Sequence, residues 1–191
     1  MKRIFNQLAM VFLFVVCWSG CSEEKRDFGK LAHIKEDCDE ARQIAKRLSN
    51  SPRGIEIASR DLSLFGGREC VWSASIILQS PLTNVVNKEL NAIIADANPG
   101  MGRKVVALDI LWKREGRKEY LLDLFKIVRA PGGADIAIGR ERLAAALSSS
   151  DVQIIERITI DKAQEMDITF EEFLNIVDNT SFGAVTQPRQ P

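Results

Sequence analysis

Reactive side chains are few in this chain of 191 residues, which contains one histidine and four cysteines. A serine or cysteine nucleophile needs a neighbouring base, so His33 would have to serve any such site. Asp37 follows one helical turn later and could orient the ring, but the pattern places His33 on the solvated face of a helix. We therefore predict a surface histidine and no catalytic residue.

Two segments of the sequence match only part of a known phosphate-binding or metal-binding loop motif. The segment Gly100-Met101-Gly102-Arg103 lacks the third glycine of a dinucleotide loop and precedes an expected strand, where that loop would follow one. Residues 161–172 share acidic positions with a calcium loop, but Ala163 cannot ligate and Met166 replaces the turn glycine. Zinc would need more soft ligands than His33 and the cysteines supply. We predict no cofactor and no metal site.

One surface feature favours a contact with another molecule. Four cations crowd around Gly116, at an expected hairpin turn, with only two glutamates to offset them. These cations are Lys113, Arg114, Arg117 and Lys118. We predict a contact surface here for an acidic partner or an anionic lipid head group. The alternative is a solvated turn whose charges keep the protein soluble.

Composition and charge exclude several classes of protein. The chain is 46% hydrophobic and balances 26 basic against 26 acidic side chains, which is the composition of a folded domain. A wholly disordered chain and a strongly basic nucleic-acid binder are therefore excluded.

The N-terminus has the features of an export signal. Lys2 and Arg3 precede an unbroken apolar run from Leu8 to Trp18, whose length is within the roughly 7 to 15 residues of a signal core. As a helix this run would rise about 16 Å, too little for the roughly 30 Å of a hydrocarbon layer. We predict a signal peptide over residues 1–20.

The motif that follows, Trp18-Ser19-Gly20-Cys21, resembles the lipobox of bacterial lipoproteins. In that family small residues precede a cysteine that receives a diacylglyceryl group and becomes the mature N-terminus. The resemblance implies that Cys21 is lipidated and anchors the protein in a Gram-negative cell envelope. Ser22 stands where aspartate would signal retention in the inner membrane, so the resemblance implies the outer membrane, facing the periplasm. Ordinary signal peptidase cleavage after Ser22 is the alternative.

Cys38 and Cys70 form the even pair that remains when Cys17 leaves with the signal peptide and Cys21 carries lipid. Disulfides persist in the oxidising periplasm, so we predict that these two cysteines bond to each other. The closed loop would stabilise the fold by about 3 to 4 kcal/mol. Two buried thiols are the alternative.

Hydrophobic spacing predicts both helices and strands. Helices are expected over 28–48, 82–97, 140–147 and from a capping box at Thr169 and Glu172 to about Asp178. Alternating apolar residues predict strands over 70–79 and 152–160. The β-rich runs 104–113 and 118–129, on either side of the turn residues 114–117, predict two further strands joined as a hairpin. Residues 55–67 are ambiguous, and residues 152–160 also fit a helix.

These elements predict an α+β fold, a mostly antiparallel sheet of about four strands with helices packed on one face. The expected organisation is a signal peptide over 1–20, a lipidated cysteine and short tether over 21–27, one domain over 28–179 and a disordered tail over 180–191.

The function expected from these features is a membrane-anchored, non-enzymatic binding or scaffold subunit of a larger envelope assembly, in contact with an envelope protein that the sequence does not identify. The alternative is a periplasmic inhibitor or immunity-type protein that caps another protein's active site. Both roles need only a stable domain and one complementary surface, so the sequence does not separate them. Neither a nucleic acid nor a small-molecule ligand is expected.

Overall fold

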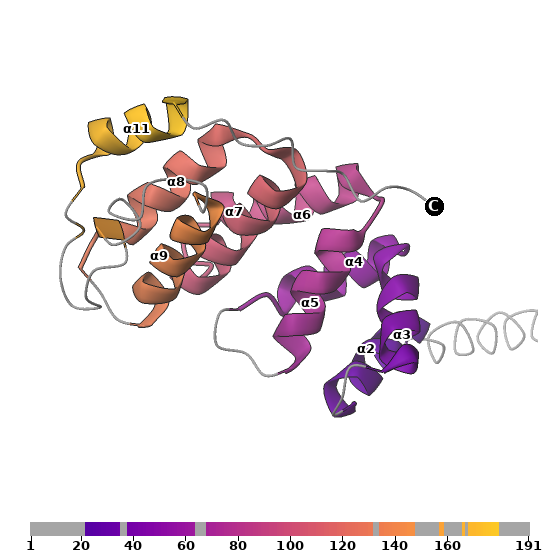
Figure 1. Ribbon diagram of the computed structural model, residues 1–191. Coiled ribbons are helices and arrows are strands. Elements are labelled where there is room, and N and C mark those ends of the chain that lie inside the picture. Colours follow the sequence, from indigo (N-terminus) through magenta and orange to yellow (C-terminus); the bar gives the residue numbers. More distant parts are fainter. Residues whose placement is uncertain are drawn as a thin grey trace, which may run out of the picture.

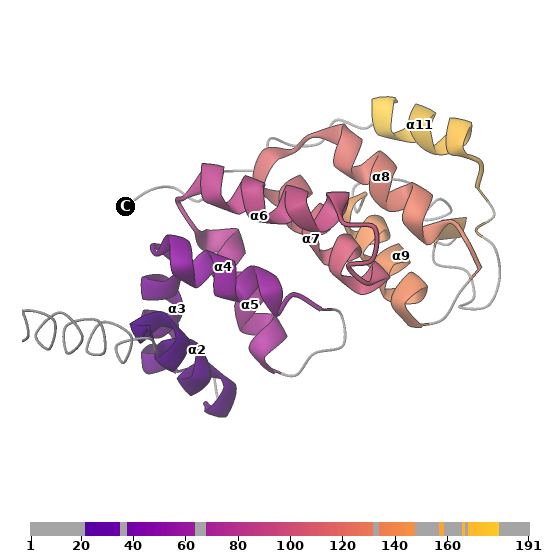
Figure 2. The same cartoon turned by 180° about the vertical axis from the view of Figure 1, so that it is seen from behind.

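The computed structural model describes residues 22–34, 38–63, 68–131, 134–147, 157–158, 166 and 168–179. The named elements in these ranges are all helices: α2 (Glu23–His33), α3 (Asp39–Ser49), α4 (Pro52–Arg60), α5 (Arg68–Gln79), α6 (Thr83–Ala95), α7 (Met101–Glu115), α8 (Lys118–Val128), α9 (Ala134–Ala146) and α11 (Phe170–Asn179). Helices α2 to α5 form one group, and α7, α8, α9 and α11 form another (Figure 1). Helix α6 leads from the first group to the second, and α2 and α11 lie far apart in both views (Figure 2).

The predicted α+β fold with a four-stranded sheet is wrong. Segments 70–79 and 104–113 lie in helices α5 and α7, and the segment 118–129 forms α8 with Arg129 as its cap. Gly116 ends α7 in the left-handed conformation, with a φ of 65°, so the expected β-hairpin is a helical hairpin. Of the fourth expected strand, 152–160, the structure describes only Arg157 and Ile158, and both are helical.

The N-terminal segment also differs from the expectation. The single helix expected over 28–48 is two helices, α2 and α3, which pack against each other. Residues 23–27, expected to be part of a tether, form the first turns of α2. The Ser22 hydroxyl accepts a hydrogen bond from the Lys25 amide at 3.4 Å and caps this helix. Residues 23–27 therefore belong to a helix of the folded domain.

Three sequence predictions are confirmed. The helix expected over 82–97 is α6, which ends before Asp96. The expected helix over 140–147 belongs to the longer α9. The capping box also forms, because the Thr169 amide donates to the Glu172 carboxylate at 2.8 Å and the Glu172 amide donates to the Thr169 hydroxyl at 3.2 Å. The ambiguous segment 55–67 contains most of α4.

The core consists of two clusters that share helix α7. The N-terminal cluster combines apolar side chains of α2 to α6 with Val106, Ala107, Ile110 and Leu111 of α7. The C-terminal cluster combines side chains of α8, α9 and α11 with Val105, Leu108 and Trp112 from another side of α7. Helix α7 is therefore buried between the two groups and couples them.

Candidate functional site

Arg114, one of the four cations of the predicted contact surface, turns toward the end of α5. Its Nη1 donates to the carbonyls of Ile77, Leu78 and Ser80 at 2.9 Å each. Carbonyls at the end of a helix lack partners within that helix, so the guanidinium supplies the missing donors. Desolvation lowers the pKa of Arg114, and the charge of Glu115 opposes this effect. Arg114 is therefore a clamp inside the molecule and is not available to a partner.

The other three cations of this turn have acidic neighbours. Lys113 Nζ lies 2.9 Å from Asp109 Oδ2, and Lys118 Nζ lies 3.5 Å from Asp178 Oδ1 of α11. Arg117 Nε lies 3.5 Å from Glu119 Oε2. The side chains of these three cations remain 41% to 58% exposed, so a contact at this turn stays a prediction. Like charge does not accumulate there as the sequence suggested.

The predicted cysteine sites are only partly described. Cys38 is a half-buried free thiol directly before α3 and packs against the N-terminal cluster. Cys70 lies in α5, and not on the expected strand, but its side chain is outside the described residues, as is all of Cys21. Helices α3 and α5 pack against each other. The disulfide and the lipidation therefore stay predictions.

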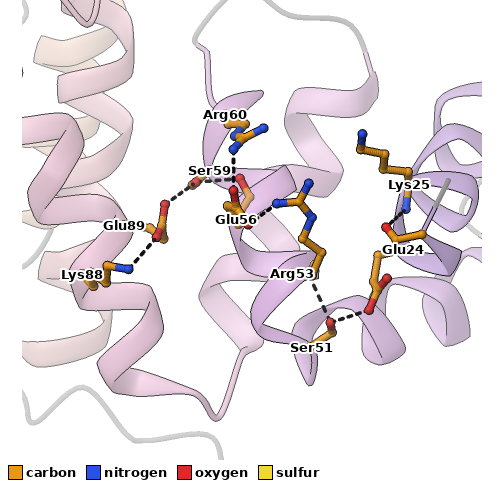
Figure 3. A network of polar contacts seen from close by, with 11 residues as sticks. Glu24, Lys25, Ser51, Arg53, Glu56, Ser59, Arg60, Lys88 and Glu89 are labelled. Atoms are coloured by element: carbon orange, nitrogen blue, oxygen red, sulfur yellow. Dashed lines mark hydrogen bonds and ion pairs between the residues drawn. The ribbon is translucent and has the colours of Figure 1, made fainter. Parts of the chain in front are cut away.

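The first turns of α2 are attached to α3 and to the loop before α4. The Ser51 hydroxyl donates to Glu24 Oε1 at 2.9 Å (Figure 3). Asp27 is buried and accepts two hydrogen bonds from Arg47, of 2.8 Å and 3.2 Å. A backbone hydrogen bond and then the Ser51 bond lower the pKa of Glu24. Two of the three acidic side chains of α2 are therefore used for internal contacts.

The opposite face of α2 is basic and exposed. Positions 26, 29, 30 and 33 share one side of the helix, and Lys25 lies beside them. Lys25, Arg26, Lys30 and His33 are exposed on this side. The Lys30 ammonium lies 3.7 Å from Asp27, whereas the side chains of Lys25 and Arg26 have no ion pair with any residue that the structure describes. The surface formed by Lys25, Arg26, Gly29, Lys30 and His33 is called the basic face of α2 below.

A small depression lies between α8 and α11. Its volume is about 180 Å³, and Phe125, Lys126, Arg129 and Phe170 line it. Lys126 Nζ lies 5.7 Å from the centre of the Phe170 ring and 2.9 Å from Asp123.

The described residues contain neither a cluster of metal ligands nor a helix that could span a membrane. No three histidine, cysteine, aspartate or glutamate side chains of that part of the chain gather as metal ligands would. None of the helices described is both long and apolar enough to cross a membrane.

Comparisons with known proteins give no relative. No family model, no curated protein and no solved structure matches this chain.

Proposed function

We propose that this protein is a lipid-anchored envelope protein whose helical domain serves as a non-enzymatic binding subunit of a larger assembly. The position of α2 carries the proposal. This helix begins at Glu23, two residues after the lipobox-like cysteine, and its cap is Ser22. A lipid on Cys21 would therefore be joined to the folded domain with no flexible tether between them.

The contacts of α2 explain how such an anchor would hold the domain. Diacylation followed by a further chain gives stable attachment, because more than one acyl chain is needed to resist dissociation. Asp27 joins α2 to Arg47 of α3, and Glu24 joins it to Ser51. An anchor at Cys21 would thus keep the whole N-terminal cluster at the membrane surface, where an assembly subunit meets its partners.

The roles of the charged side chains favour binding over catalysis. Asp109, Arg114 and Arg140 are groups that could do chemistry in a cleft, but here Asp109 accepts from Arg142 of α9, Arg114 donates to Ile77 of α5 and Arg140 donates to Val128 of α8. His33 is exposed at the end of α2. These side chains support the fold or are exposed to solvent, and a binding subunit needs none of them for catalysis.

The anchor is tested by expressing the full chain in a Gram-negative host with an alkyne-labelled fatty acid. We expect label on the wild-type protein and none on Cys21→Ala. The Cys38→Ala variant is the matched control and should keep the label, since its thiol lies beside the N-terminal cluster. Equal labelling of wild type and Cys21→Ala would contradict lipidation at this residue.

The subunit role is tested on the same envelopes, solubilised in mild detergent. We expect the protein to migrate on a native gel well above the size of its 21.3 kDa chain. Migration as the isolated chain would contradict membership of an assembly.

A further inference from the structure

We propose that the basic face of α2 binds the anionic phospholipid head groups of the membrane that holds the lipid on Cys21. This inference rests on the proposed lipid anchor and assigns a second contact between the same domain and the same bilayer.

The distribution of charge on α2 is the first argument. The helix has three acidic side chains, of which Glu24 turns to Ser51 and Asp27 is buried against Arg47. Only Glu23, at the first position, is both acidic and exposed. The cations Lys25, Arg26 and Lys30 all point to solvent. Folding therefore separates the charges of this helix and leaves one face positive.

The shape of the face is the second argument. Gly29 lies in its middle, and a Cβ placed there would meet no atom within 4 Å. A flat surface can approach the helix backbone at this point while the longer lysine and arginine side chains reach outward on either side. Long basic side chains of this kind extend to head groups and keep their charges hydrated.

The position beside the anchor is the third argument. Lys25 and Arg26 follow Cys21 by four and five residues and lie in the first turn of α2, so a lipid on that cysteine would place the bilayer within reach of their side chains. Attraction between one lysine or arginine and an anionic surface is weak by itself. Once the anchor is inserted, however, the contact is intramolecular and a weak attraction is sufficient. An acidic protein partner, by contrast, is not held near the basic face by the anchor and would have to bind from solution.

The experiment measures amine protection in the full-length chain. The protein is reconstituted into vesicles of phosphatidylcholine alone, or with phosphatidylglycerol added, and treated with a water-soluble acetylating reagent. We expect Lys25 and Lys30 to react about fivefold more slowly on the anionic vesicles. Lys46 of α3 and Lys88 of α6 are exposed controls on other surfaces and should react equally on both.

Salt and charge reversal sharpen the result. Protection of Lys30 should disappear at 1 M salt, where the screening length falls to about 3 Å. It should also disappear in the double variant Lys25→Glu, Arg26→Glu, whereas Lys88→Glu should leave it unchanged. All three substituted side chains are exposed, and an unchanged circular dichroism spectrum confirms that each variant is folded.

Two results would overturn the inference. The first is equal reactivity of Lys25 and Lys30 on neutral and anionic vesicles. The second is protection in native envelopes but not on anionic vesicles, which would assign the face to an acidic protein. The mass of the Cys21 peptide in the same digest reports acylation separately, so loss of the anchor and loss of the head-group contact give different results.

Discussion

The N-terminal and C-terminal clusters are each held by a buried aspartate between two cations. In both, one cation comes from the same helix and the other is an arginine of a neighbouring helix. The sets are Asp27 with Lys30 and Arg47, and Asp109 with Lys113 and Arg142. The cations differ in exposure, since the Arg47 side chain is 55% exposed and that of Arg142 is 32% exposed.

Each cluster also has an arginine that binds the carbonyl end of a helix. Arg114 serves α5, and Arg140 donates to the carbonyl of Val128, which ends α8, at 2.9 Å and to that of Ala130 at 3.0 Å. Arg140 is only 1% exposed. Burial lowers the pKa of the Arg140 guanidinium. The two clamps therefore differ in their access to water, and we expect the fold to depend more on the one that water does not reach.

The clusters differ most in how their helices approach. In the N-terminal cluster the chain at Gly54 of α4 lies against the Leu48 backbone of α3. In the C-terminal cluster the Phe125 and Phe173 rings stack with centroids 4.2 Å apart, and Gly139 faces the Val128 side chain. One cluster therefore depends on close backbone approach and the other on side-chain packing.

The largest effect is expected from removing the buried clamp. Arg140→Met removes the donors to the buried Val128 carbonyl and the partly buried Ala130 carbonyl and should lower the free energy of unfolding by about 4 kcal/mol. Arg114→Met should cost about 2 kcal/mol, because water reaches the end of α5. Urea unfolding measures both, with the exposed Arg129→Met as a control near zero. Equal losses at the two clamps would refute the role given to burial.

Adding a methyl group tests the two kinds of packing. Gly54→Ala would press a Cβ into the Leu48 backbone and should cost about 3 kcal/mol. Gly139→Ala meets the Val128 side chain, which can shift, and should cost about 1 kcal/mol. Gly29→Ala, in open space on α2, should instead stabilise the protein by about 0.5 kcal/mol or more through helix propensity. Thermal unfolding ranks the three variants by stability. A larger loss for Gly139→Ala than for Gly54→Ala would contradict the distinction between backbone approach and side-chain packing.

The aspartate pairs sharpen the comparison further. We expect Asp109→Asn to cost about 2 kcal/mol and Asp27→Asn about 1 kcal/mol, since Arg142 is less exposed than Arg47 and is harder to rehydrate. Denaturant midpoints measure the difference. Asp39→Asn is the control, because the Asp39 side chain is 91% exposed and its pair with Arg42 should contribute almost nothing. A larger loss at Asp27 would reverse the ranking.

The smallest effect is expected from lowering the pH, and it should be confined to α2 and α11, the first and last of the named helices. Backbone and side-chain hydrogen bonds lower the pKa of Glu24 in α2 and of Glu172 in α11 below 4.5. A lowered pKa stabilises the folded state above the ordinary value and loses this contribution as the pH falls through the folded value. The protection factors of the amides in the first turns of α2 and α11, which are exchange rates corrected for the intrinsic effect of pH, should therefore fall below about pH 4.5. Glu172→Gln should remove the pH dependence at α11 and leave that of α2 unchanged.

Several features of the fold were readable from the sequence, including one that was overlooked. The capping box of α11 and the polar break after α6 mark helix ends locally, so they were predicted correctly. Helix α8 buries Leu121, Leu124, Phe125 and Val128, which have helical spacing. Lys113 and Arg114 before Gly116 are also the usual end of a helix. These signals favoured a helical hairpin over the predicted β-hairpin.

Helix α5 shows how a pattern can mislead. A strand over 70–79 would place Leu78 on the same face as Trp72 and Ile76. In the structure Leu78 and Val71 are exposed, whereas Ser73, Ile76 and Ile77 are buried. The buried positions have helical spacing, and two of them lie on the face that a strand would have exposed. The alternating apolar residues of 70–79 therefore did not predict which side chains of α5 are buried.

The sequence by itself determined those features that depend on neighbouring residues: the ends of α6 and α11, the balance of charge and the residues that suggest an export signal. Only the tertiary structure decided that 28–48 forms two helices, that Arg114 closes the end of α5 and that α7 is a helix. Every residue from Val105 to Trp112 is buried, because two clusters cover α7. A helix covered on several sides needs no polar face, so its sequence loses the period that would identify it.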